Sequence, residues 1–189
     1  MPGFAATLRE TGVQRVWAFV EGRFGLRVGL RRRWCPRGIR PPWIVHDRYE
    51  WLWLYAAVEP MTGESFFLLL PRVTKVCFAR FLAAFATETA GDRVGVVLDG
   101  SGAHRAAISW PEHLVPLPLP RYSPELNPAE QIFRVLRAGL ANRIYENLDD
   151  LEAAMTEHLQ PWWDHPATLR RLTNYGWWAD AVAILPFSP

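Results

Sequence analysis

Two acidic residues, Asp99 and Glu130, occupy positions from which carboxylates can hold a metal ion. Asp99 follows the apolar run Val94–Leu98, which predicts a buried strand that ends in a turn. Glu130 lies in the first turn of a helix predicted after a proline-rich loop. Carboxylate oxygens are ligands that Mg²⁺ prefers. Two such ions roughly 4 Å apart catalyse phosphoryl chemistry, because one activates the attacking hydroxyl and the other stabilises the leaving oxygen.

Both acids also have a purely structural explanation. Asp99 precedes Gly100, and an Asp-Gly pair is a common turn former. Asn127, Pro128 and Glu130 fall on the N-cap, first and third positions of the predicted helix, which is a capping-box arrangement. From the residues alone, a metal site and ordinary local structure both stay open for each acid.

The elements that must position these acids follow from the hydrophobic pattern. Strands are expected at residues 15–20, 51–58, 64–70, 94–98 and 114–117. Helices are expected at residues 75–89, 128–141 and 148–159, the last capped by Asn147. The arginine-rich residues 23–40 predict a hairpin or an extended arm, and the tryptophan-rich residues 161–189 predict short helical pieces. This order predicts a mixed α/β domain with a central sheet covered by helices.

Composition favours one globular domain without a membrane anchor. The chain has 189 residues, of which 50% are hydrophobic, so it is long enough for a real core and unlike a disordered chain. We expect a lead-in over residues 1–12, the domain over 13–160 and a C-terminal extension over 161–189 that packs on the same domain. Cys35 and Cys77 show no metal-type spacing, and no apolar run approaches the roughly 18 residues that span a bilayer. We therefore expect a soluble, cytoplasmic protein with reduced thiols.

The basic residues are almost all arginines, since Lys75 is the only lysine. The guanidinium group suits bidentate contacts with phosphate, although GC-rich codon usage explains the same bias. The candidates for phosphate contact are Arg23, Arg31, Arg32, Arg33, Arg37 and, beside the predicted site, Arg121. A solvated hairpin face is the alternative for the first five. Ser101 and His104 do not indicate a serine hydrolase, because the spacing of a nucleophile elbow is missing.

The whole pattern resembles bacterial insertion-sequence transposases of the mariner-related superfamily, which carry a DDE-type catalytic domain. Residues 97–104, ending the strand and turn at Asp99, and residues 119–130, the loop that leads to Glu130, match the family's motifs for its second and third catalytic acids. Residues 17–26 resemble its first motif, and residues 32–41 the motif that follows. The resemblance extends over about residues 13 to 180.

This resemblance implies an RNase-H-like fold with a five-stranded mixed sheet and helices on both faces. It implies cleavage of transposon ends, followed by attack of a 3′-hydroxyl on target DNA, with Mg²⁺ (or Mn²⁺) held by Asp99 and Glu130. The implied partners are double-stranded DNA and further copies of the chain assembled on it, and the implied location is the cytoplasm, on the nucleoid when DNA is bound. Family members carry a helix-turn-helix region ahead of the catalytic domain. Here the first strand is expected at about residue 15, so a separately encoded helix-turn-helix protein is a further expected partner.

One departure from the family affects the chemistry. Val20 occupies the position of the first catalytic Asp, and the adjacent Glu21 points to the opposite face of a strand. We therefore expect impaired activity, with a catalytically silent protein that binds DNA or modulates an active transposase as the alternative. The 30 residues between Asp99 and Glu130 are a few fewer than usual in the family, a difference that loop length can absorb.

Overall fold

The computed structural model describes residues 2–27, 29–32, 34–39, 48–99, 108–120 and 122–185. Ser101, His104, Arg33 and Arg121 lie outside these residues, so the predictions that fall on them stay predictions. The strands are β1 (Arg15–Gly25), β2 (Trp51–Val58), β3 (Ser65–Leu70), β4 (Val94–Leu98) and β5 (Leu114–Pro118). They form one five-stranded sheet in the order β3-β2-β1-β4-β5. The β1–β4 and β4–β5 pairs are parallel, whereas β2 is antiparallel to both of its neighbours, so the sheet is mixed as expected.

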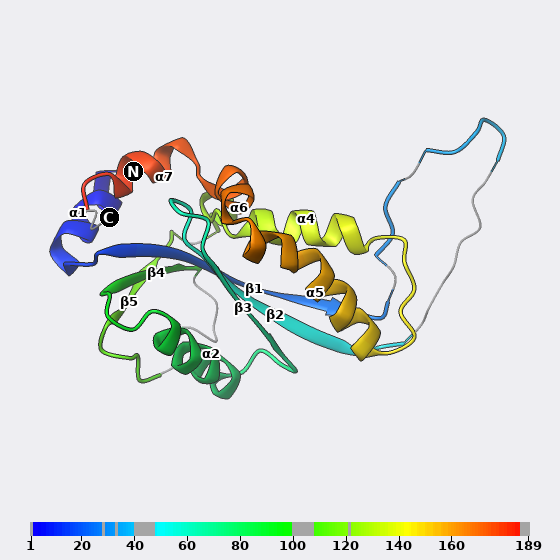
Figure 1. Cartoon of the computed structure of the whole chain (residues 1–189), viewed down its shortest axis with the longest axis horizontal. Coiled ribbons are helices and arrows are strands. Elements are labelled where there is room, and N and C mark those ends of the chain that lie inside the picture. Colours follow the sequence, from blue (N-terminus) through cyan, green and yellow to red (C-terminus); the bar gives the residue numbers. More distant parts are fainter. Residues whose placement is uncertain are drawn as a thin grey trace.

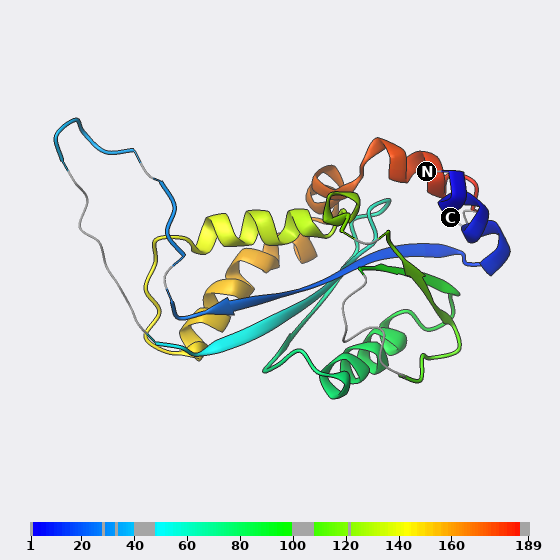
Figure 2. The same ribbon diagram turned by 180° about the vertical axis from the view of Figure 1, so that it is seen from behind.

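The helices cover both faces of this sheet (Figures 1 and 2). They are α1 (Pro2–Thr11), α2 (Lys75–Glu88), α4 (Glu130–Leu140), α5 (Leu148–Asp164), α6 (Pro166–Thr173) and α7 (Gly176–Val182), with a 3₁₀ turn, η1 (Pro124–Leu126), before α4. Helix α2 lies on one face, and α4 and α5 lie on the other. Each face therefore has its own hydrophobic core, and β1 contributes alternate side chains to both.

Strand composition agrees with strand position. All five residues of β4 are buried, as expected for a parallel strand with packed layers on both faces. β5 carries Pro116 and Pro118, which have no backbone N–H to donate, and it lies at the edge of the sheet. The capping predicted for α5 is confirmed, because the Oδ1 of Asn147 accepts from the Asp150 N–H at 2.9 Å. In the described part of the chain, no helix is long and apolar enough to cross a membrane.

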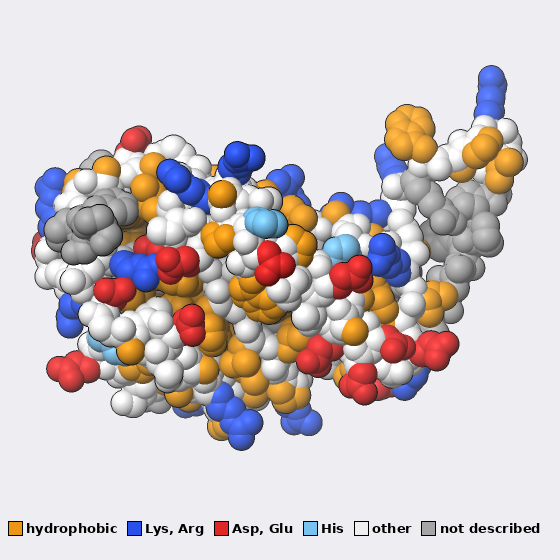
Figure 3. All heavy atoms as spheres, in the orientation of Figure 1, with side chains coloured by type: hydrophobic (Ala, Val, Ile, Leu, Met, Phe, Trp, Pro, Cys, Tyr) orange, Lys and Arg blue, Asp and Glu red, His pale blue; other side chains and the backbone are white. Residues whose placement is uncertain are grey.

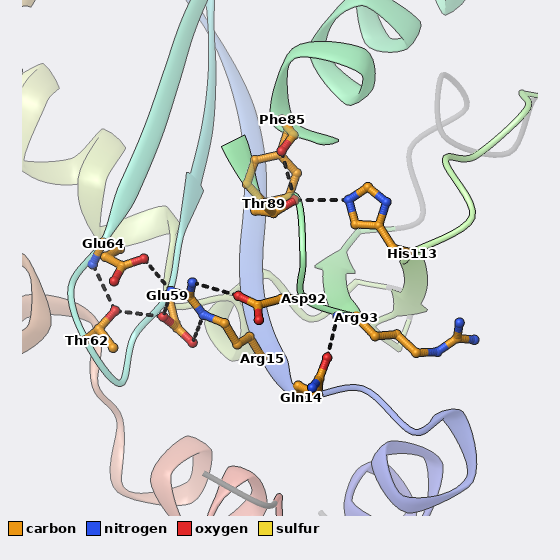
Figure 4. Close-up of polar contacts among 10 residues, drawn as sticks. All are labelled: Gln14, Arg15, Glu59, Thr62, Glu64, Phe85, Thr89, Asp92, Arg93 and His113. Carbon is orange, nitrogen blue, oxygen red and sulfur yellow. Dashed lines mark hydrogen bonds and ion pairs between the residues drawn. The ribbon is translucent and has the colours of Figure 1, made fainter. Parts of the chain in front are cut away.

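The start of β1 is fixed by an ion-pair network at the end of the sheet away from Asp99 (Figure 4). The guanidinium group of Arg15 pairs with Glu59 and Glu64 from the β2–β3 turn and with Asp92 before β4. Glu59 is buried, and its hydrogen bond and charge raise the pKa of Arg15 above its ordinary value. Thr62 donates a further hydrogen bond of 2.8 Å to Glu59. These contacts tie β1 to its neighbours on both sides.

Three elements are longer than the sequence predicts. β1 continues to Gly25 because β2 pairs with it along the register Ala18↔Val58 to Gly25↔Trp51. α5 runs through Pro161 to Asp164, with Trp162 buried in the core. Residues 2–11, expected only as a lead-in, form α1. The arginine-rich residues 29–32 and 34–39 belong to an extended arm that projects from the body, one of the two alternatives predicted (Figures 1 and 2).

Candidate metal centre

The parallel pairing of β1 with β4 sets the position of the first candidate acid. Ala18 lies opposite Val97 in this pair, and continuing the register by two residues brings Val20 alongside Asp99. Ala18, Val20 and Val97 all belong to the core on the α4 side of the sheet. Alternation along the strand directs Asp99 to this same side, where it is exposed beyond the end of β4.

The second candidate acid is positioned by Asn127, which is only 2% exposed. Its Nδ2 donates to the Phe19 carbonyl oxygen on β1 at 2.8 Å, and its Oδ1 accepts from the Ala129 N–H at 3.1 Å. The Asn127 N–H donates to the Pro124 carbonyl oxygen at 2.9 Å, so it does not need the side chain of Glu130 as a partner. The helix begins at Glu130 with Ala129 as its N-cap residue and no side-chain cap bond, so the predicted capping box of Asn127 and Glu130 is wrong. Asn127 instead holds the turn that precedes α4. The carboxylate of Glu130 is left available for other chemistry.

Further contacts hold α4 against β1 close to these acids. Phe133, one turn after Glu130, stacks on Phe24 with ring centroids 5.7 Å apart. The same ring lies over Gly22, where an added Cβ would come within 2.2 Å of Cε1 of Phe133. A glycine at this position in β1 thus permits the close approach of the helix. The start of α4 is consequently fixed over the strand that carries Val20.

The electrostatics show that acids from three elements influence one another. Burial raises the pKa of the Glu130 carboxyl above its ordinary value by disfavouring the charged form. The like charges of Asp99 and Glu21 raise this pKa further, and the guanidinium group of Arg137 lowers it. The two predicted acids therefore lie within electrostatic range of each other, as a shared cation site requires.

Glu21 does not share the α4 side of the sheet with Val20. Its strand neighbours Trp17 and Phe19 belong to the core under α2, and alternation directs Glu21 to that face. It lies opposite Tyr55 of β2, whose pKa is raised mainly by burial and further by the charge of Glu21. Val20 is the residue on the α4 side, and it is 8% exposed. Position 20, between the core and Asp99, therefore carries the methyl groups of a valine, which cannot bind a metal ion.

The donor set fits a divalent cation only in part. Asp99 and Glu130 supply hard oxygen atoms whose mutual repulsion a cation would relieve. Among the described residues, no three His, Cys, Asp or Glu side chains are grouped closely enough to form a complete protein site. The arrangement therefore suits an ion held by two carboxylates and otherwise by water, and it lacks the bridging ligand of a site for two ions.

The basic residues predicted to contact DNA are exposed where the structure describes them. Arg23 extends from the end of β1 over the ring of Trp51, 4.2 Å from its centroid, and Arg31, Arg32 and Arg37 lie in the arm. The sequence analysis did not select Arg137 and Arg143, which lie in and just after α4. Arg137 follows Glu130 by seven residues, a spacing that places both on one face of a helix, and this signal was present in the sequence.

Comparison with known proteins identifies the family. The family model described as DDE superfamily endonuclease matches residues 15–152, from the start of β1 to the first turns of α5. The chain belongs to the DDE superfamily endonucleases. The matched range includes both acids, Asp99 and Glu130, and the loop that contains Asn127. A relative from Sinorhizobium fredii, uncharacterized protein y4pE/y4sA, is 31% identical over 104 residues, which are 53% of this chain and 77% of the relative.

Solved structures with the same fold include several of the Mos1 transposase. A pre-cleavage Mos1 transpososome has a TM-score of 0.65 at 13% identity and covers 100% of this chain. A Mos1 paired-end complex with the left transposon end has a TM-score of 0.62 at 15% identity and covers 96% of this chain. The chain spans 61% and 58% of those two Mos1 chains, about three fifths of their length. The expected RNase-H-like fold of this DDE endonuclease domain is confirmed.

Proposed function

We propose that this chain is the catalytic domain of an insertion-sequence transposase, which cuts DNA at transposon ends and has impaired activity because Val20 replaces the first acid. The proposal is supported by Asp99 at the end of β4 and Glu130 at the start of α4, whose charges influence each other within the family's domain. Mos1 paired-end complexes with Mn and with Mg are among the similar structures. They support a divalent cation as the cofactor of this chain.

Each residue of the candidate centre has its own role in the proposed chemistry. Asp99 and Glu130 would hold Mg²⁺ or Mn²⁺, which when bound activates the attacking oxygen and stabilises the leaving one. Arg137 favours the ionised form of Glu130 and so keeps it able to bind a cation. Asn127 holds the helix start against β1, which fixes the direction of the Glu130 carboxylate. Val20 removes one negative charge and one ligand from the site.

A catalytically silent protein is the second candidate, and the buried apolar Val20 is the observation that favours it. Such a protein would bind DNA or assemble with an active transposase without cutting. In both cases we infer double-stranded DNA as the partner, copies of the chain assembled on it, and a separately encoded helix-turn-helix protein that reads the ends. The place of action would be the cytoplasm, on the nucleoid when DNA is bound.

The test measures nicking of DNA that carries the terminal sequences of the insertion element containing this gene, in the presence of Mg²⁺ or Mn²⁺, by the unaltered protein and by variants. The variants are Val20→Asp, Glu130→Ala and Asp99→Ala. We expect weak cleavage by the unaltered protein, a gain in Val20→Asp, and loss in both alanine variants. Cleavage by the unaltered protein that depends on Glu130 would refute the silent candidate, and cleavage that survives Glu130→Ala would refute the proposed site.

A second readout does not depend on turnover. Val20→Asp places a third carboxylate beside two others, so without a cation it should lower the melting temperature. Mn²⁺ should then raise the melting temperature of Val20→Asp more than that of the unaltered protein, because binding to the folded state stabilises it. An equal response of the two proteins would show that position 20 does not face the cation.

A further inference from the structure

An arginine-lined pocket of about 290 Å³ lies where the end of β1, the end of α4 and the start of α5 meet. Five arginines from two distant stretches of the chain surround it: Arg23, Arg27, Arg31, Arg137 and Arg143. Tyr145 and the aliphatic side chains of Leu140 and Leu151 complete the lining. Among the described residues, no acidic side chain contributes to the lining. In Figure 3, basic side chains follow the upper edge of the body towards the arm, whereas acidic side chains gather over the start of α5.

The walls of this pocket are held by specific hydrogen bonds. Asn142, in the left-handed conformation with a φ of 58°, donates its backbone N–H to the Gly29 carbonyl oxygen at 3.0 Å. Its Oδ1 accepts from the Arg31 N–H at 3.1 Å. The segment after β1 is thereby joined to the segment after α4. The guanidinium group of Arg137 lies over the rings of Phe24 and Phe133, 5.7 and 5.6 Å from their centroids. These contacts hold the two stretches of the pocket wall together and orient the guanidinium group of Arg137.

None of the pocket arginines forms an ion pair with a described carboxylate, although the charge of Arg137 acts on Glu130 from a distance. The ion pairs among the described residues involve Arg15 and Arg48, and none of the five pocket arginines lies within 4.0 Å of a described carboxylate. The Oη of Tyr145 is buried in the lining beside the guanidinium group of Arg143, and its O–H has no acceptor among the described residues. Five like charges around one hollow, with a buried hydroxyl left to donate, attract an anion with several acceptor oxygens.

We propose that this pocket binds a backbone phosphate of the DNA substrate, about three base steps along the duplex from the phosphate at the candidate metal centre. The inference rests on the proposed function, since it takes DNA as the substrate. Arg137 follows Glu130 by seven residues on one face of α4, a distance of about 10 Å along the helix axis. That length corresponds to roughly three base steps of a duplex. The planar guanidinium forks match the geometry of phosphate oxygens.

The test measures binding of a short duplex by fluorescence anisotropy over a range of salt concentrations, without divalent cations. The variant is Arg27→Gln/Arg143→Gln, which leaves both candidate metal ligands intact. The matched control is Arg72→Gln/Arg80→Gln, which removes two exposed charges at α2 on the opposite face of the sheet. We expect the pocket variant to weaken binding about tenfold and to lower the salt slope by about 0.9 for one lost phosphate contact, with little change in the control.

A second measurement does not need a substitution. Arginines of the unaltered protein are modified with phenylglyoxal, with and without the duplex, and quantified by mass spectrometry. DNA should protect Arg27 and Arg143 several-fold more than Arg72 and Arg80. Equal protection, or equal affinity of the two double variants, overturns the pocket assignment while DNA binding itself stands.

Two further outcomes separate the inference from its premise. Tight binding of inorganic phosphate, together with unchanged DNA affinity in the pocket variant, would show a site for a free anion and overturn the inference. Failure of every version, including the unaltered protein, to bind the duplex would refute the proposed DNA substrate, and the pocket inference would fall with it. Loss of cleavage in Glu130→Ala with intact pocket protection would leave the two sites distinct and the inference supported.

Discussion

The substitution Asn127→Ala should destabilise the domain more than an ordinary helix-cap substitution does. Asn127, Phe19 and Ala129 are all essentially buried, and the asparagine side chain bonds to the backbone of both neighbours. Alanine would remove the donor to the Phe19 carbonyl oxygen and the acceptor for the Ala129 N–H. A buried polar group that loses its partner costs about 1–3 kcal/mol, so we expect a total near 3 kcal/mol. For a domain of this size, that corresponds to a fall in melting temperature of roughly 6–12 °C.

The chain contains a matched control for this prediction. Asn147 caps α5 with a bond of 2.9 Å to the Asp150 N–H, but it is exposed and has no second bond to a strand. Asn147→Ala should therefore cost only about 1 kcal/mol. Urea unfolding followed by circular dichroism gives both free energies of unfolding from their midpoints. Equal costs for the two substitutions would refute the reasoning that the bond to Phe19 fixes the helix start.

Three further substitutions test the electrostatics and the packing. The raised pKa of Glu130 means that ionisation of its carboxyl opposes folding, so Glu130→Gln, measured with a chelator present, should raise the melting temperature at neutral pH. The difference should vanish as the pH falls below the ordinary carboxyl range. A variant that is less stable than the unaltered protein at every pH contradicts this. Gly22→Ala should lower the free energy of unfolding in urea by about 1–3 kcal/mol, since the added Cβ meets the Phe133 ring. Gly176→Ala, whose added Cβ meets nothing within 4 Å, should be neutral or stabilising. Arg15→Gln should lower the free energy of unfolding by about 3 kcal/mol, because it leaves the buried Glu59 without its charged partner. Arg48→Gln, at the exposed pair with Glu50, should change the free energy of unfolding by less than about 1 kcal/mol. Similar values for both would show that the network at Arg15 adds no stability.

Much of this architecture is predictable because local pattern and tertiary position agree. The apolar run Val94–Leu98 predicts the buried strand β4, and Phe78, Phe81 and Phe85, which recur at helical spacing, form the buried face of α2. The helix after the loop at Asn127 was also found, although it starts at Glu130, two residues later than predicted, because its first turn is of the 3₁₀ type. In these segments periodicity alone carries the information.

The remaining features of the fold and of the candidate site depend on long-range contacts, which no local sequence pattern contains. The last residues of β1 are strand because Trp51 and its neighbours pair with them, and this pairing is long-range. The bond from Asn127 to Phe19 joins residues 108 positions apart, so a sequence window shows only a helix cap. The pocket at Arg137 and Arg143 forms because Asn142 bonds to the segment after β1, which scattered arginines in a sequence do not reveal. The two acids were found through the family motif, whereas their electrostatic proximity needed the folded chain.

The bond between Asn127 and Phe19 also has a consequence for synthesis of the chain. The apolar face of β1 on the α4 side emerges from the ribosome 108 residues before the asparagine that will hold its cover in place. At translation rates of about 5–20 residues per second, this face stays without α4 for roughly 5–20 s. A message cut short before codon 127 would therefore yield a chain with strands but with that core open, a species prone to aggregate.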